Sequence, residues 1–456
     1  MKLLSLTHGM DTRQYMAVIK VYEYSHLSIN ELFTEKHFEQ IVKYNELHGN
    51  KYFNIGNKRV YFKNHVGVLQ IGNLTIEILP KADKTEGEDA KNKWHNALVY
   101  MLHICGYLNI DSISQADLQI QRLTLIELFY KVFLTEVEAI VHQGLIRKYR
   151  YNTDNRNFLK GRLIYSKHIS QNHLHKEKFY TSAQVYDHDN PFNQILLKAL
   201  RILRNNSNSN RFYSEVCNLL YYFDNITDIK ITDGTFENLK FTRNTVKYTK
   251  AITLARLIIQ NYFPDIKTGN NNVVGLLFDM NMLYEKVVYK LLKKHEAQFQ
   301  QCQLKLISQC SKIFWSSRTI RPDIMGEYFS LTDQKKKRFI IDTKWKRPND
   351  GNPADDDLKQ MYAYNVHFGA FSSILLYPDC DQQIPKANSF NDSVSIKEEY
   401  KKHSCSTFYI QMFDENGKIR NDTGVELLNS VIFGNTACAR PCAPAEEGAG
   451  LRNDSF

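Results

Sequence analysis

The order of hydrophobic and polar residues changes character along the chain. Between residues 15 and 80, short runs of β-branched and aromatic residues are broken by glycine and asparagine, as in MAVIKVYEY, RVYFKNHVGVLQI and LTIEILP. Runs of this kind are typical of strands. A charged, glycine-containing stretch follows at 81–92. We therefore predict a β-rich domain over residues 1–92.

Apolar residues recur every three or four positions in the next part of the chain, which is the periodicity of a helix. The clearest examples are NALVYMLHICGYL, LTLIELFYKVFLTEVEAIVHQGL and the stretches 193–204 and 212–223. The polar run NNSNSN at 205–210 separates the last two and predicts a loop. Residues 93–265 should thus form a mainly helical middle domain.

A second asparagine-rich break, GNNN at 269–272, precedes another change. Beyond it the pattern predicts helix, strand, strand, helix and strand, which is the mixture found in an α/β domain. We assign residues 266–434 to this domain. Residues 435–456 are rich in alanine, proline and glycine without apolar periodicity, so we expect a disordered tail. The predicted fold class is α/β multidomain.

Composition and charge narrow the classes of function. Of the 456 residues, 43% are hydrophobic, and the formal net charge is +10. The chain should fold into packed domains and favour polyanionic partners such as nucleic acid. It has neither a run of about 18 apolar residues nor a signal-peptide core, so we expect a cytoplasmic protein without a membrane partner. Its eight cysteines lack the paired spacing of a zinc site.

Residues 147–178 are strongly basic. Nine Lys and Arg residues occur there with only two acids, and aromatic residues are interleaved with them. Such a patch contacts phosphates or an acidic partner surface, but a solvated surface hairpin has the same composition. Both interpretations stay open. The candidate residues for contact with DNA or a partner are Arg147, Lys148, Arg150, Lys160 and Arg162.

The clearest chemical signal lies in RFIIDTKWK at 338–346. In a strand, the alternation of side chains points Asp342 and Lys344 to the same face. Nineteen positions earlier (342 − 323), Asp323 follows Pro322 in a second apolar strand. Two neighbouring strands can therefore bring both carboxylates and the ammonium to one place.

This trio suits hydrolysis of a phosphodiester. Carboxylates are preferred ligands of Mg²⁺, and the bound ion activates water and stabilises developing charge. We expect Asp323 and Asp342 to hold Mg²⁺, the Thr343 carbonyl to add an oxygen ligand, and Lys344 to orient the water. By itself, Pro-Asp followed by Asp-x-Lys is a weak motif in a lysine-rich chain.

Two flanking helices add candidates. In DDDLKQMYAYNVHF, Gln360 and Tyr364 are i,i+4 neighbours that can bond a DNA phosphate or the catalytic lysine. A surface glutamine and a half-buried tyrosine fit the spacing equally well. In MNMLYEKVVYKLL, Glu285 lies within the apolar face, either as a helper of the metal site or as a surface acid with its head in water.

At this point the chain resembles a known family. The segments GVLQIGNLTIEILPK, FLKGRLIYSKHI, DNPFNQILLKAL, FDMNMLYEKVV, RPDI, IIDTKWK, LKQMYAY and SILLYPD, in this order, resemble the McrC family over nearly the whole chain short of the tail. Members of that family are nuclease subunits of GTP-dependent restriction systems that attack modified DNA. The resemblance implies a restriction-endonuclease-like C-terminal core of the PD-(D/E)xK type. Its catalytic residues would be Asp323, Asp342 and Lys344, with Gln360 as the helix glutamine.

The resemblance also implies partners. These are double-stranded DNA and a McrB-like AAA+ GTPase hexamer. The N-terminal part of this chain would dock on the hexamer and stimulate its GTPase activity. The chain has no G-x-x-x-x-G-K-[ST] loop, so GTP is expected on the partner. Cutting both strands needs two active sites, so two nuclease domains should meet. Three functions compete: a partner-driven endonuclease subunit, an autonomous nuclease, and a non-catalytic activator of an NTPase. The complete trio argues against the last.

Overall fold

The computed structural model describes residues 17–82, 87–108, 123–206, 212–263, 272–346, 348, 352–378, 386–390 and 403–433. The chain divides into two compact units, one made of residues 1–283 with 415–418 and the other of 284–414 with 419–456. The division falls inside helix α10 (Met280–His295). The tail expected at 435–456 lies outside the described residues.

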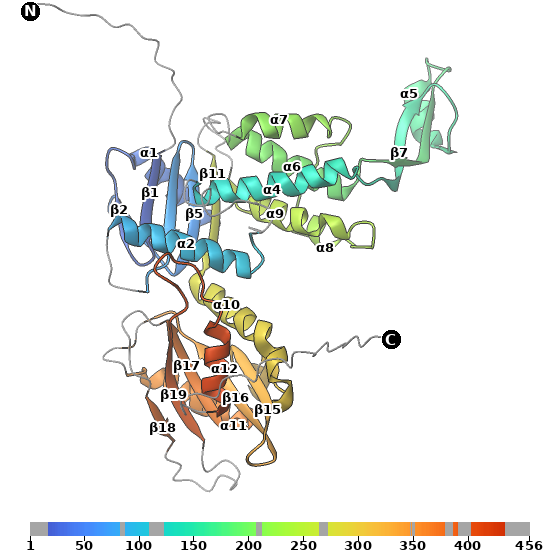
Figure 1. Ribbon diagram of the computed structural model, residues 1–456. Coiled ribbons are helices and arrows are strands. Elements are labelled where there is room, and N and C mark those ends of the chain that lie inside the picture. The colour runs from blue at the N-terminus through green and yellow to red at the C-terminus, as the bar shows by residue number, and fades with distance from the viewer. Residues whose placement is uncertain are drawn as a thin grey trace, which may run out of the picture. The chain divides into compact units, whose positions relative to one another are not determined.

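The first unit contains a five-stranded sheet with helices beside it (Figure 1). Its strand order is β1-β6-β5-β11-β10, with β1 parallel to β6 and the remaining pairs antiparallel. The strands are β1 (Ala17–Tyr22), β6 (Leu74–Leu79), β5 (His65–Ile71), β11 (Val273–Asp279) and β10 (Tyr262–Phe263). Strands β5 and β6 are buried along their whole length, which explains their nearly continuous apolar sequence.

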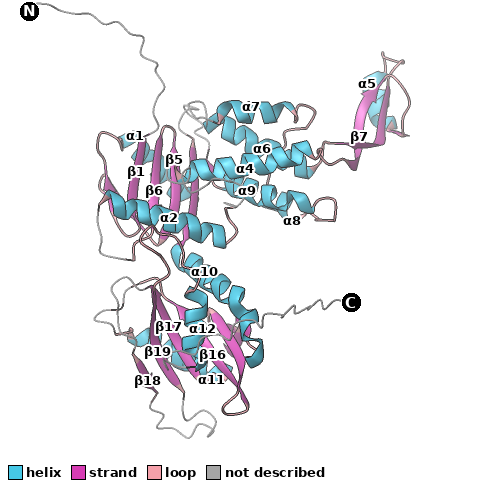
Figure 2. Ribbon diagram, viewed as in Figure 1, coloured by secondary structure: helices cyan, strands magenta, loops and turns pink. Residues whose placement is uncertain are grey.

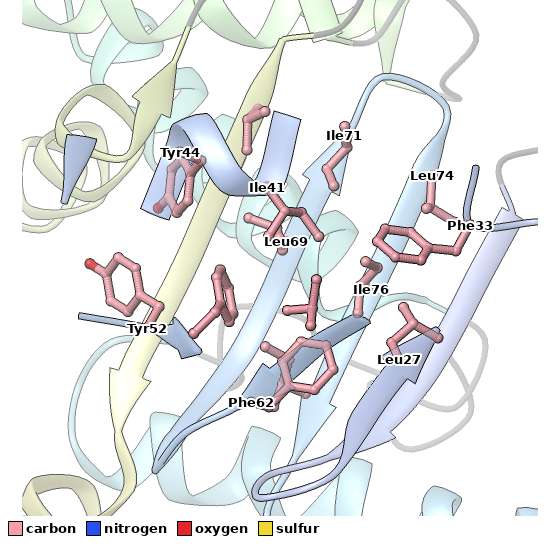
Figure 3. Close-up of a cluster of buried hydrophobic side chains, with 14 residues drawn as sticks. Leu27, Phe33, Ile41, Tyr44, Tyr52, Phe62, Leu69, Ile71, Leu74 and Ile76 are labelled. Carbon is pink, nitrogen blue, oxygen red and sulfur yellow. The ribbon is translucent and has the colours of Figure 1, made fainter. Parts of the chain in front are cut away.

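A hydrophobic core lies between this sheet and helix α1 (Glu35–Leu47), with a small second sheet beside it (Figure 3). The small sheet has the order β2-β4-β3, from β2 (His26–Ser28), β4 (Arg59–Phe62) and β3 (Phe53–Gly56). Leu69 and Ile76 of the large sheet, Ile41 and Tyr44 of α1, and Phe62 of β4 share the core. Full burial of one such side chain contributes about 1.5–3 kcal/mol.

Helix α1 was not expected from the sequence, where this region was predicted to be strand-rich. Its local signals are present, because Ile41 and Tyr44 are three residues apart on its buried face and Thr34 precedes the helix as N-cap. The neighbouring strand-like runs concealed them. The first unit therefore opens with a mixed α/β fold.

The boundary expected after residue 265 does not match the division of the chain. Strand β11 was assigned to the C-terminal domain, but it pairs with β5 from Val273↔Ile71 to Asp279↔His65. Both strands are apolar, and a local pattern does not specify which distant strand completes a sheet. The first unit consequently extends to Leu283.

Helices make up most of the stretch between residues 88 and 260, as the periodicity predicted (Figure 2). They are α2 (Glu88–Ile104), α4 (Leu125–His142), α6 (Pro191–Asn206), α7 (Tyr213–Tyr221), α8 (Asp233–Glu237), the 3-10 turn η2 (Val246–Tyr248) and α9 (Thr249–Gln260). Helix α6 packs against α7 and α9. Thr124 and Glu127 form a capping box that starts α4.

An arm is inserted in the sequence between α4 and α6 and projects from one end of the helices (Figure 1). We use the term arm for residues 148–187, which form β7 (Lys148–Arg156), β8 (Arg162–Leu163), α5 (Tyr165–Asn172) and β9 (Phe179–Asp187). The strands pair antiparallel in the order β7-β9-β8. At the root, the Asn193 amide donates to the carbonyls of Ile146 (3.1 Å) and His188 (2.7 Å), which holds the two ends of the arm together.

The second unit is built on a mixed six-stranded sheet with the order β12-β15-β16-β17-β19-β18. The strands are β12 (Lys305–Ser308), β15 (Ile324–Ser330), β16 (Lys335–Thr343), β17 (Ser372–Pro378), β19 (Ser404–Ile410) and β18 (Ala387–Ser389). Strands β16, β17 and β19 are parallel neighbours, whereas β12, β15 and β16 pair antiparallel. The unit is therefore α/β, as predicted.

Helix α11 (Asp355–Phe368) connects β16 to β17 and packs on β16, β17 and β19 (Figure 2). It ends at Gly369, whose φ of +64° is the left-handed conformation that glycine adopts readily at a helix end. The unit also contains η3 (Glu296–Cys302), α12 (Thr423–Phe433) and a two-stranded hairpin of β13 (Lys312–Trp315) and β14 (Arg318–Ile320). Across the described ranges, no helix combines the length and apolar character needed to cross a membrane.

Candidate functional site

Two aspartates meet where β15 begins and β16 ends. These strands pair antiparallel from Ser330↔Lys335 to Ile324↔Ile341. Continued by one residue (324 − 1, 341 + 1), this register puts Asp323 opposite Asp342, and directly opposed residues are close neighbours. The structure thus brings together two carboxylates that are far apart in the sequence.

One carboxylate is held by the neighbouring strand. Oδ2 of Asp323 accepts hydrogen bonds from the backbone N–H and the hydroxyl of Thr343, both at 2.7 Å. Thr343 had been expected to contribute its carbonyl oxygen to a metal. Its amide and hydroxyl instead orient Asp323, and a metal contact by the carbonyl stays a prediction.

Lys344 lies directly after β16, and its backbone N–H continues the strand pairing by donating to the Leu376 carbonyl at 2.9 Å. Its Nζ lies 2.7 Å from Oδ2 of Asp342 and 3.3 Å from Oδ1 of Asp357. It also donates to Oε1 of Gln360 at 3.1 Å. The ammonium is therefore restrained by two carboxylates and one amide.

Gln360 and Tyr364 support this lysine from helix α11. Nε2 of Gln360 donates to the Tyr364 hydroxyl (2.7 Å), which donates to the Arg321 carbonyl (3.0 Å). The sequence suggested that Tyr364 contacts DNA or a partner. In the structure it is only 5% exposed, so it does not lie on a surface that either can contact. Its burial follows from packing of α11 on the sheet, and its hydroxyl is hydrogen-bonded to Gln360.

Asp357 was missed as a site residue. It is one of three consecutive acids in the first turn of α11, and it was not among the predicted site residues. It is 8% exposed and accepts a hydrogen bond from Nζ of Lys346 at 2.6 Å, in addition to its contact with Lys344. The spacing of Asp357, Gln360 and Tyr364 (i, i+3, i+7) places them on one helical face, and that signal could have identified it.

Glu285 approaches the same region from α10. Its Oε1 accepts a hydrogen bond from Nε2 of Gln309 at 3.0 Å, and the backbone N–H of Gln309 donates to the Asp323 carbonyl at 2.8 Å. Burial raises the pKa of Glu285, and the nearby Asp323 raises it further. A third carboxylate is therefore close enough to interact with the pair.

The electrostatics favour a bound cation. Burial is the largest cause of the raised pKa of Asp342, and the charge of Asp323 raises it further, while the charge and hydrogen bond of Lys344 oppose the rise. Burial alone would lower the pKa of Lys344, but Asp342 and Asp357 hold it above its usual value. Lys344 therefore stays charged, while Asp342 has negative neighbours that one ammonium does not balance.

The residues fit Mg²⁺ better than a closed metal cage. Within the described part of the chain, no three His, Cys, Asp or Glu side chains form a metal-binding cluster. Oδ2 of Asp342 is buried and, despite its short distance to Lys344, receives no hydrogen bond of suitable geometry from the described residues. Mg²⁺ is commonly held by one or two carboxylates and keeps several waters. Asp323 and Asp342 would supply these ligands.

The cations predicted from the basic segment lie on or beside the arm, in the first unit. Arg150 is neutralised there: it donates to both carboxylate oxygens of Asp187 at 2.9–3.1 Å and lies 3.2 Å from Asp189. Nζ of Lys148 lies 4.1 Å from the centre of the Phe192 ring. Arg150 and Lys148 therefore stabilise the root of the arm. The acids that pair with Arg150, Asp187 and Asp189, lie outside the basic segment 147–178 from which the patch was predicted.

The other three candidate cations, Arg147 beside the arm and Lys160 and Arg162 on it, are exposed. Arg147 donates to Nε2 of His188 at 3.1 Å, and Lys160 and Arg162 are solvent-facing. Large exposed side chains accompany them, namely Tyr149, Tyr151, Phe158, Leu159, Tyr165, Ile169, Leu174 and Tyr186. The arm therefore presents an exposed surface that is both basic and apolar, and such surfaces mark interaction sites.

Comparison with known proteins identifies the class of system. Residues 60–378 match the family described as McrBC 5-methylcytosine restriction system component. The match spans most of both units and includes Asp323, Asp342, Lys344 and Gln360. The chain belongs to this family, and the resemblance found in the sequence is confirmed.

Two similar proteins agree with this result. The type IV methyl-directed restriction enzyme EcoKMcrBC of Escherichia coli (strain K12) is 25% identical over 254 residues, which cover 54% of this chain and 72% of that protein. A solved assembly of Thermococcus gammatolerans McrB AAA+ hexamers with bound McrC contains a chain with a TM-score of 0.64 at 19% identity. The match covers 91% of this chain and all of the other, and it shows that the two share a fold.

Proposed function

We propose that this chain is the DNA-cleaving subunit of a restriction system, a Mg²⁺-dependent endonuclease of the PD-(D/E)xK type with a restriction-endonuclease-like core. The observation that carries the proposal is the meeting of Asp323, Asp342 and Lys344 at one end of a mixed sheet, with Gln360 bonded to Lys344. Two carboxylates and an ammonium suit metal-dependent hydrolysis of a phosphodiester.

Each residue has a role in this reaction. Mg²⁺ held by Asp323 and Asp342 would activate water and stabilise the charge that develops on the phosphate. Thr343 fixes the direction of the Asp323 carboxylate, while Lys344 offsets negative charge on the phosphate. Gln360 restrains Lys344 through one hydrogen bond. Glu285 adds negative charge on the side of α10.

The proposed partner is an AAA+ GTPase hexamer resembling McrB. Support comes from the fold shared with a chain of the assembly of McrB AAA+ hexamers with bound McrC. The chain itself has no P-loop sequence, so GTP would be bound and hydrolysed by the partner. The exposed surface of the arm is the proposed docking element. Duplex DNA carrying 5-methylcytosine is the proposed target, because the family is described by that modification.

The test is a cleavage assay with the purified chain. Methylated and unmethylated plasmids are incubated with the chain and Mg²⁺, then with the partner NTPase and GTP, and then with a non-hydrolysable GTP analogue. We expect efficient cutting of the methylated plasmid only with partner and GTP. EDTA should abolish it.

Other results select the competing functions. Full cutting by the lone chain at stoichiometric concentration identifies an autonomous nuclease. Stimulation of the partner's GTPase without cutting under any condition identifies a non-catalytic activator. Equal cutting with GTP and with the non-hydrolysable analogue shows that GTP hydrolysis is not needed, and it leaves the nuclease assignment in place.

A further inference from the structure

The β13–β14 hairpin is an exposed element beside the candidate site. Every residue from 311 to 319 is exposed, including Ile313 (69%) and Trp315 (66%). Three residues lead from Ile320, the last residue of β14, to Asp323, which limits the distance between them to about 11 Å. The root of the hairpin therefore lies within reach of a long ligand bound at Asp323.

One side of the hairpin is anchored to the second unit. Nζ of Lys312 donates to the His367 carbonyl at 3.0 Å, and the Phe314 ring contacts the His367 ring edge-on at 6.1 Å. Ile320 packs against the hydrophobic core around Tyr364. The root is thus fixed relative to α11, which also carries Gln360.

The other side has no such role in packing. Trp315 pairs with Arg318 across the turn, and the register shifts between Ile313 and Trp315. Such bulges redirect side chains, and Ser316 has a positive φ of 49° at the tip. The result is a short ribbon whose end displays an indole and a guanidinium to solvent.

The charge of the ribbon indicates its partner. Residues 309–322 include Lys312, Arg318 and Arg321 and no acid. A second copy of the same ribbon, meeting it across a two-fold axis, would face like charges, which are unfavourable. DNA offers phosphates to the cations and base and sugar faces to an apolar wedge.

We propose that the β13–β14 hairpin contacts the DNA duplex beside the scissile phosphate, with Arg318 on the backbone and Trp315 and Ile313 in the minor groove. The proposal rests on the proposed nuclease function and deepens it by assigning a DNA-binding element to this chain rather than to a partner. The hairpin holds the duplex in a fixed orientation relative to Asp323.

The experiment compares two double variants of the full-length chain. In W315A/R318A, the hairpin loses its indole and guanidinium. In the control L331A/K336A, an exposed apolar residue and an exposed cation are removed at the far end of β15 and β16. Binding to a labelled duplex of about 30 base pairs is measured across a salt titration, with Ca²⁺ in place of Mg²⁺. Light scattering follows the oligomeric state and thermal melting the fold.

We expect W315A/R318A to bind at least about 10-fold more weakly, with a shallower salt dependence, and the control to stay within about twofold of wild type. Both should melt like wild type. Equal affinity of W315A/R318A and wild type for DNA overturns the proposal. If W315A/R318A also loses a dimer that wild type forms, the hairpin is a self-association surface instead. If a wild-type chain that binds through the hairpin does not cut DNA even with Mg²⁺, the partner NTPase and GTP, the proposed function is contradicted and this inference is left standing.

Discussion

Asp323 and Thr343 are joined twice, because one carboxylate oxygen, Oδ2, accepts both the amide and the hydroxyl hydrogen of Thr343 at 2.7 Å. The pairing fixes the carboxylate at the start of β15 against the end of β16, next to Asp342. In the proposed function Asp323 is a metal ligand, and groups that hold metal ligands in place affect affinity and activity by about 10- to 100-fold.

Thr343→Val should therefore reduce cleavage about 10-fold and raise the Mg²⁺ concentration needed for half-maximal activity. The substitution keeps the shape and the backbone bond and removes only the hydroxyl bond. Thr343→Ser restores a hydroxyl and should retain near wild-type activity. A Mg²⁺ titration of plasmid cleavage distinguishes the variants, and equal titration curves would contradict the role given to Thr343.

Loss of a charged group from the trio should abolish cleavage without unfolding the protein. For Asp323→Asn, Asp342→Asn and Lys344→Ala we expect at least about 100-fold slower cutting, because these groups act on the metal, the water and the phosphate. Asp333→Asn, at the turn between β15 and β16, is the control. Mg²⁺-dependent cutting by Asp342→Asn or Lys344→Ala at a rate close to that of wild type excludes this site assignment.

Stability should depend on pH through Asp342. Its pKa is raised by burial and by Asp323, so the folded state holds the proton more tightly than the unfolded chain. The free energy of unfolding therefore falls as pH rises from the unfolded pKa through the folded one. In EDTA, Asp342→Asn should melt higher than wild type at pH 8, and the difference should shrink toward pH 5.

Magnesium should reverse the order of the two melting temperatures, so that wild type melts above Asp342→Asn. Adding Mg²⁺ at pH 8 should raise the melting temperature of wild type, because the ion binds the folded state, and should leave Asp342→Asn nearly unchanged. Differential scanning calorimetry of both proteins, with and without Mg²⁺, measures the effect. If the difference in melting temperature between wild type and Asp342→Asn in EDTA stays constant from pH 5 to 8, ionisation of Asp342 is excluded as the source of that difference.

Asp357→Asn should impair catalysis through Lys344. The variant keeps the size of the side chain but loses the charge that pairs with Lys344 and Lys346. We expect kcat to fall about 10-fold with little change in KM, because a misplaced catalytic group slows the chemical step. Asp356→Asn, in the same helical turn but highly exposed, is the matched control. Equal kinetics for the two variants would show that Asp357 does not position the lysine.

The arm should show two different kinds of cation. Lys160→Glu with Arg162→Glu should weaken binding to the partner or to DNA and leave the melting temperature unchanged, because both side chains are exposed. Arg150→Glu should lower the melting temperature, since it places a third carboxylate beside Asp187 and Asp189. Affinities of K160E/R162E equal to wild type across a salt titration would support a solvated arm without a binding role.

The sequence by itself determined those features of the site that depend on local periodicity. Alternation along β16 puts Asp342 and Lys344 on one face, and their contact of 2.7 Å agrees with this. The four-residue spacing of Gln360 and Tyr364 likewise makes them neighbours on α11. These relations are set by the geometry of one strand and one helix, so they can be read from adjacent residues.

Only the tertiary structure decided relations between distant segments. The register of β15 on β16 places Asp323 opposite Asp342, and the choice of β5 as neighbour carries β11 into the first unit. The fold also brings Asp189 to Arg150 and buries Tyr364 beneath the site. Each of these outcomes depends on packing between parts of the chain that are far apart in sequence. Local periodicity shows which face of an element is apolar, but it does not specify which distant element covers that face.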